Sequence, residues 1–294
     1  MLKTGKGTDV RSYWEVTKPK IWYLLVFTAF MASLIAYHVH DIAFSPLTLL
    51  LVITSVMAGS AAANTLTNYI DRDIDAKMER TRSRPIPSGR ISPKDALYYG
   101  LILAGVSVVL AYLINIWALG LMIFGLFDNV VVYSKWLKRR SLWSIVLGGF
   151  SGGAPALIGY VAVTTSMIEL GFVLAGLAFL WIPTHIWSLA LHIKDDYARA
   201  NVPMLPVVKS ESTSVRVIAG TTLMMVLFSI LPFFMNTFGW IYLGAASILG
   251  AIIIAMSISL LARPTEKKSW MLFKFSSPYL AFLFVAMYVD ALIF

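Results

Sequence analysis

Residues 46–69 read PLTLLLVITSVMAGSAAANTLTNY and contain no charged side chain. This stretch exceeds the roughly 20 apolar residues that a helix needs to cross a bilayer. It runs directly into the acidic sequence Ile70-Asp-Arg-Asp-Ile-Asp75. Because the interior of a bilayer offers no water to backbone polar groups, the stretch predicts a membrane-spanning helix that ends in a cluster of carboxylates.

The rest of the chain repeats this apolar pattern. Stretches free of Lys and Arg also run over 21–40, 96–114, 117–134, 145–164, 170–193, 217–236, 239–261 and 275–294. Of the 294 residues, 59% are hydrophobic and 13% are charged, which is about half the charged fraction of a soluble domain. We therefore predict an all-α, polytopic membrane protein. About nine transmembrane helices are expected to bundle around a central cavity that opens to the cytoplasmic side.

The composition also limits the function classes. A soluble globular enzyme is excluded, and the absence of cysteine excludes disulfides, Cys-ligated zinc and iron–sulfur clusters. We expect residues 1–294 to form a single integral-membrane domain. Within it, residues 1–20 form a cytoplasmic N-terminal segment, and 70–95 and 194–216 form two cytoplasmic loops that carry the active site.

The basic residues lie on one side of the predicted spans. All 24 Lys and Arg fall in the N-terminal segment or in the segments after spans two, four, six and eight. The loops near 41–45, 115–116, 165–169 and 236–238 contain none. The positive-inside rule then predicts a cytoplasmic N-terminus and an external C-terminus. The net charge of +9 therefore reflects membrane topology, and we expect no nucleic-acid partner.

The end of the second span carries the first candidate site. Asn64, Asn68, Asp71 and Asp75 are spaced by four, three and four residues, which places them on one face of a helix. Mg²⁺ binds through one or two carboxylates together with substrate phosphates. A solvated helix end is the alternative interpretation. The basic Pro/Gly segment over 77–90 that follows favours a metal-chelated diphosphate as the ligand.

The sixth span carries a second polar face. Trp181, His185, Ser188 and His192 recur at helical spacing and lead to Asp195 and Asp196. Ionisable groups inside a membrane are costly and usually face a cavity. We predict that the histidines line a cavity. A hydrogen-bonded core histidine and a haem-iron ligand are the alternatives.

Two further features of the spans are predicted to face the bundle interior. Asp128 lies within the fourth span, where a charge is expensive, and a structural hydrogen bond with Asn129 or a neighbouring helix is the alternative to a cavity role. The glycine-rich stretch from Gly148 to Gly159 favours close helix packing over phosphate binding.

These residues resemble the UbiA superfamily of intramembrane prenyltransferases. The superfamily motif NxxDxxxD is matched by Asn68, Asp71 and Asp75. The run NYIDRDIDAKMERTRSRPIPSG over 68–89 is similar to the protoheme IX farnesyltransferase (haem O synthase) branch. Three more segments agree with that branch: TKPK over 17–20, LKRRSLWSIVLGGFSGGAPALIGY over 137–160, and HIWSLALHIKDDYARANVPMLPVV over 185–208.

The resemblance implies transfer of a farnesyl group from farnesyl diphosphate to a vinyl group of haem B, with hydration, giving haem O and diphosphate. Haem B is then a substrate and Mg²⁺ the cofactor. The implied catalytic residues are Asn68, Asp71, Asp75, Asp195 and Asp196, with Asp71, Asp75 and Asp196 as metal ligands. The implied diphosphate-binding residues are Lys20, Arg84, Lys138 and Arg139. The implied acceptor or prenyl cavity contains Asn64, Asp128, Tyr133, His185 and His192.

Two alternatives stay open at this point. One is a UbiA-type transferase acting on a quinone precursor or a lipid, which typically has a second DxxxD motif where this chain has Asp195-Asp196. The other is a secondary transporter, whose binding groups gather at the bilayer midplane rather than at its boundary. The resemblance also implies a prokaryotic plasma membrane and a pathway link to haem A synthase or a terminal oxidase.

Overall fold

The computed structural model describes residues 9–293, and all regular elements in that range are helices. As predicted, nine helical segments of the described chain are long and apolar enough to cross a membrane. These segments are α2 (Pro19–Val39), α3 (Pro46–Ile70), α5 (Pro93–Ile114), α6 (Ile116–Phe127) with η1 (Asp128–Leu137), α7 (Ser144–Leu147) with α8 (Phe150–Val161), α9 (Ile168–His192), α12 (Glu211–Phe234), α13 (Trp240–Ala262) and α14 (Glu266–Ala291). The predicted fold class is confirmed, and the chain is a polytopic membrane protein.

Local sequence explains where the spans begin. Pro19, Pro46 and Pro93 occupy the first turns of α2, α3 and α5, where a missing N–H costs nothing. The hydroxyl oxygens of Ser45 and Ser92 accept hydrogen bonds from the free amides of α3 and α5. These caps satisfy backbone groups that the lipid cannot.

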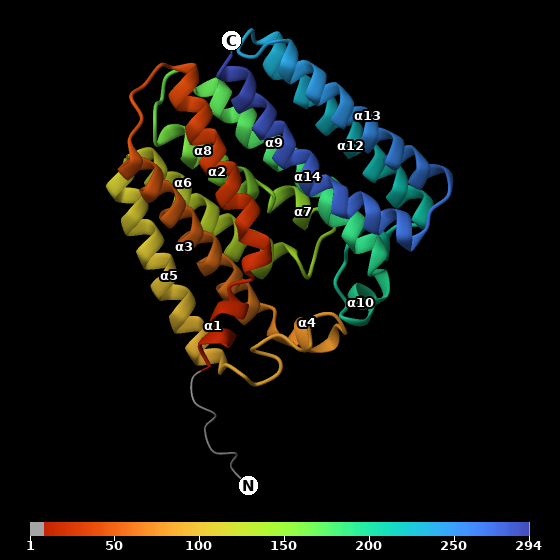
Figure 1. Cartoon of the computed structure of the whole chain (residues 1–294). Helices are drawn as coiled ribbons and strands as arrows, with labels where there is room; N and C mark the ends of the chain where they lie inside the picture. Colours follow the sequence, from red (N-terminus) through yellow and green to blue (C-terminus); the bar gives the residue numbers. More distant parts are fainter. Residues whose placement is uncertain (1–8, 294) are drawn as a thin grey trace.

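The long helices pack in a ring whose order follows the chain. α2 packs against α3, α3 against α5, α5 against α6, and α6 against α8; the series continues through α9, α12, α13 and α14, which returns to α2. In Figure 1, α3, α5 and α6 form one side of the molecule, and α12, α13 and α14 form the other. The α7–α8 span is the most enclosed, with 78% of its apolar window buried against 17% for α5.

The glycine-rich stretch serves close packing, as predicted. A side chain at Gly159 would meet the carbonyl oxygen of Ala29 at 2.1 Å. The Ser33 hydroxyl donates to the Gly159 carbonyl at 2.8 Å. The missing side chain therefore allows α8 to lie directly on α2.

The largest difference from a predicted boundary is at the start of the last span. The last span was expected to start at residue 275, whereas α14 begins at Glu266. Thr265 caps the helix by accepting from the Lys268 amide at 3.2 Å, and Lys268 Nζ donates to the Ser259 carbonyl at 2.7 Å. The basic residues are thus accommodated within the first turns of the helix, and the hydropathy pattern marked only where α14 becomes apolar.

The fourth span changes its helical pitch. Residues Asp128–Leu137 form a π-helix that continues α6, and the Lys138 amide donates to the Tyr133 carbonyl, five residues back, at 2.8 Å. The sequence analysis did not predict this change. Such wide turns are frequent at functional sites.

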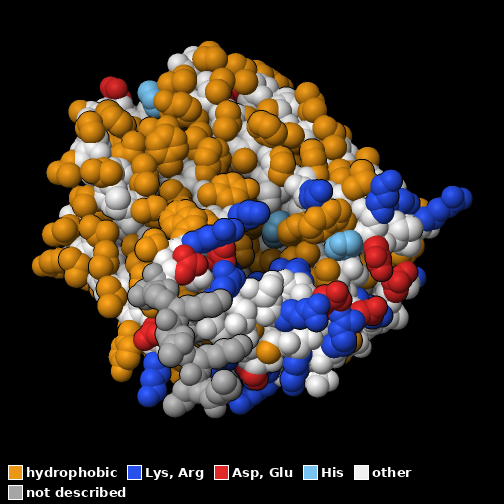
Figure 2. Space-filling model, turned by 60° about the horizontal axis from the view of Figure 1, so that its bottom comes forward, with side chains coloured by type: hydrophobic (Ala, Val, Ile, Leu, Met, Phe, Trp, Pro, Cys, Tyr) orange, Lys and Arg blue, Asp and Glu red, His pale blue; other side chains and the backbone are white. Residues whose placement is uncertain are grey.

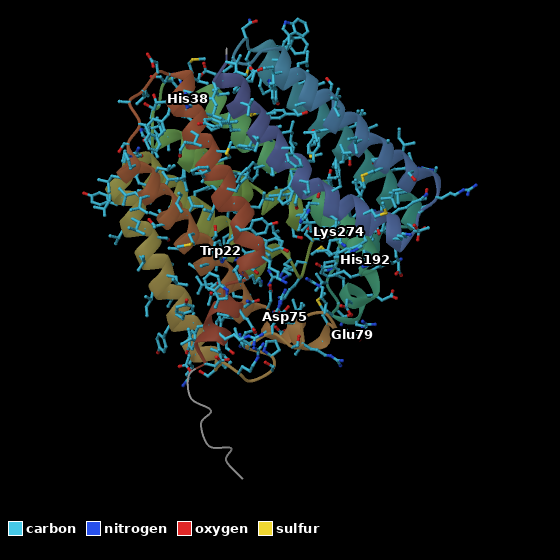
Figure 3. All side chains as sticks on the ribbon, viewed as in Figure 1. Trp22, His38, Asp75, Glu79, His192 and Lys274 are labelled. Carbon is cyan, nitrogen blue, oxygen red and sulfur yellow. The ribbon has the colours of Figure 1, made fainter. Side chains whose placement is uncertain are left out.

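One end of the bundle carries the charge. The short helix α1 (Val10–Val16) precedes α2, and the short helices α4 (Arg72–Lys77), α10 (Lys194–Arg199) and α11 (Leu205–Val208) connect long ones. In Figure 1, α1, α4 and α10 lie at the bottom of the view. Figure 2 shows Lys, Arg, Asp and Glu gathered on that end, below a surface that is mostly hydrophobic. In Figure 3, Asp75 and Glu79 lie at this end and His38 at the other.

Candidate active site

Asp71 lies at the break between α3 and α4, where its backbone leaves the helical conformation. Its side chain is buried, and Oδ2 accepts from the Ser134 hydroxyl at 3.2 Å and pairs with the Lys138 ammonium. Ser134 and Lys138 come from the π-helix and from the residue that caps it. Within the described residues, Asp71 Oδ1 is buried without a hydrogen-bond partner. This oxygen remains available to a ligand.

Asp75 forms the second buried pair. Arg84 Nη1 donates to both carboxylate oxygens, at 2.9 and 2.8 Å, and lies 3.3 Å from Asn68 Oδ1. Asn68 Nδ2 in turn donates to the Val16 carbonyl of α1 at 2.7 Å. The predicted Asn68, Asp75 and Arg84 are therefore brought together, and the basic loop folds back over α3.

Lys18 is a site residue that the sequence analysis missed. It caps α2 in a left-handed conformation, with φ of 54°, and the following Pro19 removes the helical alternative for it. Burial of its amine lowers the pKa of Lys18 well below the ordinary lysine value, Arg84 and Lys138 lower it further, and Asp75 and Asp71 oppose the shift. Lys18 is therefore close enough to the cluster for the charges of these four groups to act on it. The predicted Lys20 is instead exposed on the first turn of α2.

The pKa of Lys138 is shifted in the direction opposite to that of Lys18. Burial would lower its pKa, but the neighbouring Tyr133 and Asp71 outweigh burial and raise the pKa of Lys138. Its ammonium also lies 5.6 Å from the centre of the Tyr133 ring. Lys138 therefore stays charged in contact with Asp71.

Asp196 connects α10 to the segment that follows α4. Its oxygens accept from the backbone amides of Glu79 and Arg80, each at 3.1 Å, and it pairs with Arg199. Burial opposes ionisation, yet the Arg80 and Glu79 amides and the Arg199 guanidinium lower the pKa of Asp196. Here Asp196 positions the loop after α4. Asp195 lies exposed on α10.

Arg139 lies at the edge of the cluster. Its guanidinium binds Asp73 with two hydrogen bonds of 2.7 and 2.6 Å and donates to the Ile70 carbonyl at 2.9 Å. Both partners are exposed, and the pKa of Asp73 is lowered by the hydrogen bond from Arg139. Asp73 and Asp75 thus form similar pairs with arginine, one outside the cluster and one inside it.

His185 and His192 lie on α9 and contact α14. The His185 ring stacks between Trp181 and Phe273, with ring centres 4.3 Å apart in each case, and Nδ1 lies 2.7 Å from the Ser276 hydroxyl. His192 stacks on Trp270 at 4.8 Å, and its Nδ1 is buried without a partner in the described chain. Both histidines therefore contact α14, and Figure 3 shows His192 near Lys274 of that helix.

Asp128 has a structural partner. It is 4% exposed, and Oδ2 accepts from the Ser151 amide, in the first turn of α8, at 2.8 Å. A carboxylate at a helix N-terminus is favoured by the free amides and the helix dipole. This contact is the neighbouring-helix hydrogen bond that the sequence analysis gave as the alternative.

An apolar cavity lies beside the charged cluster. It has a volume of about 110 Å³ and is lined from α2, α3, α6, η1 and α8. Asn64 of α3 lines it, as does Asn129 of η1. The other predicted cavity residues, Asp128, Tyr133, His185 and His192, are not among those that line it.

The cluster contains oxygen ligands suited to a divalent cation. Asp71 Oδ1 is free, whereas Arg84 engages both oxygens of Asp75, and amides and Arg199 engage those of Asp196. In the described residues no group of three or more His, Asp or Glu side chains is placed to hold a metal ion. The residues therefore fit a cation that takes one or two carboxylates and fills its other positions with substrate oxygens and water, as Mg²⁺ does.

Comparison with known proteins agrees with this geometry. Residues 21–285 match the model of the UbiA prenyltransferase family. Protoheme IX farnesyltransferase 2 of Cenarchaeum symbiosum is 53% identical, with 99% of each chain covered. A solved structure of digeranylgeranylglyceryl phosphate synthase superposes with a TM-score of 0.80 at 23% identity, covering 97% of this chain and 99% of that one.

A solved UbiA homolog from Archaeoglobus fulgidus, bound to DMAPP and Mg²⁺, has a TM-score of 0.64 at 17% identity, covering 94% of this chain and 99% of that one. The likenesses to solved structures concern the fold, and the family match covers most of the chain. With nine spans in its described residues and the NxxDxxxD carboxylates at one end of the bundle, the chain belongs to the UbiA prenyltransferase family.

Proposed function

We propose that this protein transfers a farnesyl group from farnesyl diphosphate to a vinyl group of protoheme IX and adds water, giving haem O and diphosphate. The observation that carries the proposal is the pair of buried carboxylate–cation contacts, Asp71 with Lys138 and Asp75 with Arg84. The acceptor is supported by the name of the relative that is 53% identical.

The charged cluster supplies what a diphosphate leaving group needs. Arg84 and Lys138 offer cationic donors, and Lys18 offers an amine, in a site largely closed to solvent, where such groups stabilise developing charge more strongly than in water. Asp71 and Asp75 would hold Mg²⁺ together with the diphosphate oxygens. When bound, Mg²⁺ would act as a Lewis acid that neutralises the leaving group. Asp196 acts by fixing the loop at Glu79 and Arg80.

The reaction balances as follows. The bond between C1 of the farnesyl group and the diphosphate oxygen breaks, and its electron pair leaves with diphosphate. The π electrons of the haem vinyl group form a bond from its terminal carbon to C1. The cation left on the inner vinyl carbon is captured by a water oxygen, and that water loses a proton to give the hydroxyl group of haem O.

The α9–α14 side of the cluster is the proposed acceptor side. A continuous series of rings in contact, all stacked except for the tilted His185–Phe273 pair, is formed by Trp181, His185, Phe273, Trp270 and His192. Aromatic faces stabilise nearby cations by about 0.5–2 kcal/mol each and offer an apolar surface to a porphyrin. The proposed orientation places this end at the cytoplasmic face of a prokaryotic plasma membrane. Haem A synthase or a terminal oxidase would use the product.

A quinone precursor or a lipid is the competing acceptor. The experiment offers purified protein farnesyl diphosphate and Mg²⁺ with equal concentrations of haem B, a phenolic quinone precursor and a glycerol-ether lipid, and identifies products by mass. Farnesylation of haem B alone is expected. A farnesylated phenol or lipid in place of the haem product would overturn the acceptor assignment, and product formation in the Asp75→Asn variant at the wild-type rate would overturn the site.

A further inference from the structure

Helices α12 and α13 form a pair on the outer side of the bundle. The two helices pack against each other, and Figure 1 shows them at one edge of the molecule. Only 33% and 28% of their apolar windows are buried within the protein. Most of the surface of this pair therefore faces the lipid, and a hollow in that surface is filled from the membrane.

A hollow that contains both signs of charge lies where α12 begins and α13 ends. It has a volume of about 440 Å³ and is lined by Glu211, Ser212, Val215 and Arg216 of α12, and by Leu261 and Pro264 at and just beyond the end of α13. Glu211 and Arg216 are both exposed. In the part of the chain that the structure describes, neither forms an ion pair with another side chain. Both charges are therefore available to a ligand.

An apolar hollow continues along α12. It has a volume of about 470 Å³ and is lined by Gly220, Leu223, Met224, Leu227 and Phe228. Arg216 lies on the same face as Gly220, Leu223 and Leu227, because these positions are spaced by four, three and four residues. Nothing lies within 4 Å of where a side chain at Gly220 would begin, so the surface is open between the charged hollow and the apolar one.

The order of groups along α12 matches the order of groups in a phospholipid with a zwitterionic headgroup. Glu211 begins the helix, Arg216 lies about 7.5 Å farther along the axis, and Leu227 lies about 16 Å beyond Arg216. Such a lipid presents an outer ammonium group, then a phosphate and then hydrocarbon tails. The acid, the base and the apolar strip of α12 therefore meet these three parts in sequence.

The chemistry of each contact favours this class of lipid. A guanidinium binds a phosphate through two parallel hydrogen bonds, and a long basic side chain near the end of a membrane helix reaches toward the headgroups. The Glu211 carboxylate can accept hydrogen bonds from an ammonium group. A lipid with a phosphate and no ammonium would satisfy Arg216 but would bring its negative charge close to Glu211 without offering a cation to it.

We propose that the two hollows on α12 form a binding site for one glycerophospholipid whose headgroup carries a phosphate and an ammonium group. Arg216 binds the phosphate, Glu211 binds the ammonium group, and the strip from Gly220 to Leu227 holds a hydrocarbon tail. The site shares no residue with the charged cluster at Asp71 and Asp75, so it does not depend on the proposed reaction.

Two substitutions with matched controls test the two hollows. Arg216→Gln removes the phosphate partner. Its control is Lys94→Gln, because Lys94 is exposed in the first turn of the lipid-facing α5 and lines neither hollow. Gly220→Leu fills the apolar hollow. Its control is Gly244→Leu on α13, because nothing lies within 4 Å of a new side-chain carbon at either glycine.

The experiment uses native mass spectrometry of the full chain in detergent. It measures the dissociation constants of the first bound phosphatidylethanolamine and phosphatidylglycerol, which are given identical tails. Wild type should bind phosphatidylethanolamine more tightly. Arg216→Gln should weaken the binding of both lipids by about tenfold, the loss expected for one charge-assisted contact, and Gly220→Leu should weaken both as well. Glu211→Gln should remove the preference for phosphatidylethanolamine, and both controls should keep the wild-type constants.

Several results would overturn parts of the proposal. Equal constants in Arg216→Gln and Lys94→Gln would overturn the phosphate contact and with it the site. Equal binding of the two lipids to wild type would overturn the zwitterionic headgroup. Soluble glycerophosphoethanolamine that competes as strongly as the lipid would overturn the role of the apolar hollow. Farnesyl diphosphate and haem are absent from these measurements, so a failure of the proposed function would leave their outcome unchanged.

Discussion

Asp75 and Asp73 provide a matched test of the buried site. They lie two residues apart on α4, and each accepts two hydrogen bonds from one arginine. The Asp75 side chain is 3% exposed and its partner Arg84 23%, whereas Asp73 and Arg139 are 56% and 39% exposed. The same substitution, Asp→Asn, should therefore have different effects at the two positions.

The magnitudes follow from burial. Removing one partner of a buried pair costs about 3–5 kcal/mol, and Asp75→Asn should fall at the lower end because Arg84 reaches solvent and asparagine keeps one acceptor oxygen. Loss of an oriented charge in the active site should lower kcat by about 10²–10³. Asp73→Asn should cost about 0–1 kcal/mol, as exposed pairs do, with turnover within a factor of about three.

The assay measures diphosphate release in detergent. Thermal unfolding of the same samples is monitored by size-exclusion chromatography. Equal turnover in the two variants would refute the reasoning that only the buried carboxylate serves the reaction. A large loss of stability in Asp73→Asn would refute the estimate for the exposed pair.

Three further predictions concern topology, the acceptor side and the outer end. Cysteines introduced at 41 and 166 should react with an impermeant reagent from outside, and those at 82, 139 and 266 only after permeabilisation; the reverse pattern would contradict the proposed orientation. His185→Ala should weaken haem binding while farnesyl diphosphate affinity is unchanged. Ser276→Ala, which removes only the hydrogen-bond partner of His185, should weaken haem binding less. Equal losses of affinity for both ligands in both variants would mean that His185 only connects α9 to α14. Burial lowers the pKa of His40, whose Nε2 lies 2.7 Å from the Tyr160 hydroxyl. As the pH falls through about 6.5, the unfolded chain therefore takes up a proton that the folded chain resists, and stability is lost. Between pH about 7.5 and 5.5 the melting temperature should drop less in His40→Asn than in the wild type, and identical drops would count against this role of His40.

The sequence predicted the parts of the molecule that depend on local pattern. The nine spans follow from hydropathy, and the common face of Asn68, Asp71 and Asp75 follows from spacing along one helix. These features need no knowledge of which helices become neighbours.

The features that the sequence did not predict depend on contacts between distant segments. Lys18 lies near the cluster, with a left-handed backbone just before α2, whereas Lys20 on the first turn of α2 is exposed. Asp128 caps α8 through an amide 23 residues away, a contact that the sequence analysis gave only as the alternative to a cavity role. The π-helix that aims Ser134 and Lys138 at Asp71 has no signature in hydropathy. The TKPK segment was the one signal that pointed toward Lys18.

The central claim is that the buried cluster directs a farnesyl cation to the haem vinyl group with capture of water. The most direct test is to incubate the purified protein with farnesyl diphosphate, Mg²⁺ and haem B in water labelled with the heavy isotope of oxygen. The masses of all products are then determined. The account predicts a porphyrin that carries one farnesyl group and one heavy oxygen, formed by the wild type and not by Asp75→Asn. Heavy oxygen found only in free farnesol, with the porphyrin unchanged, would contradict it.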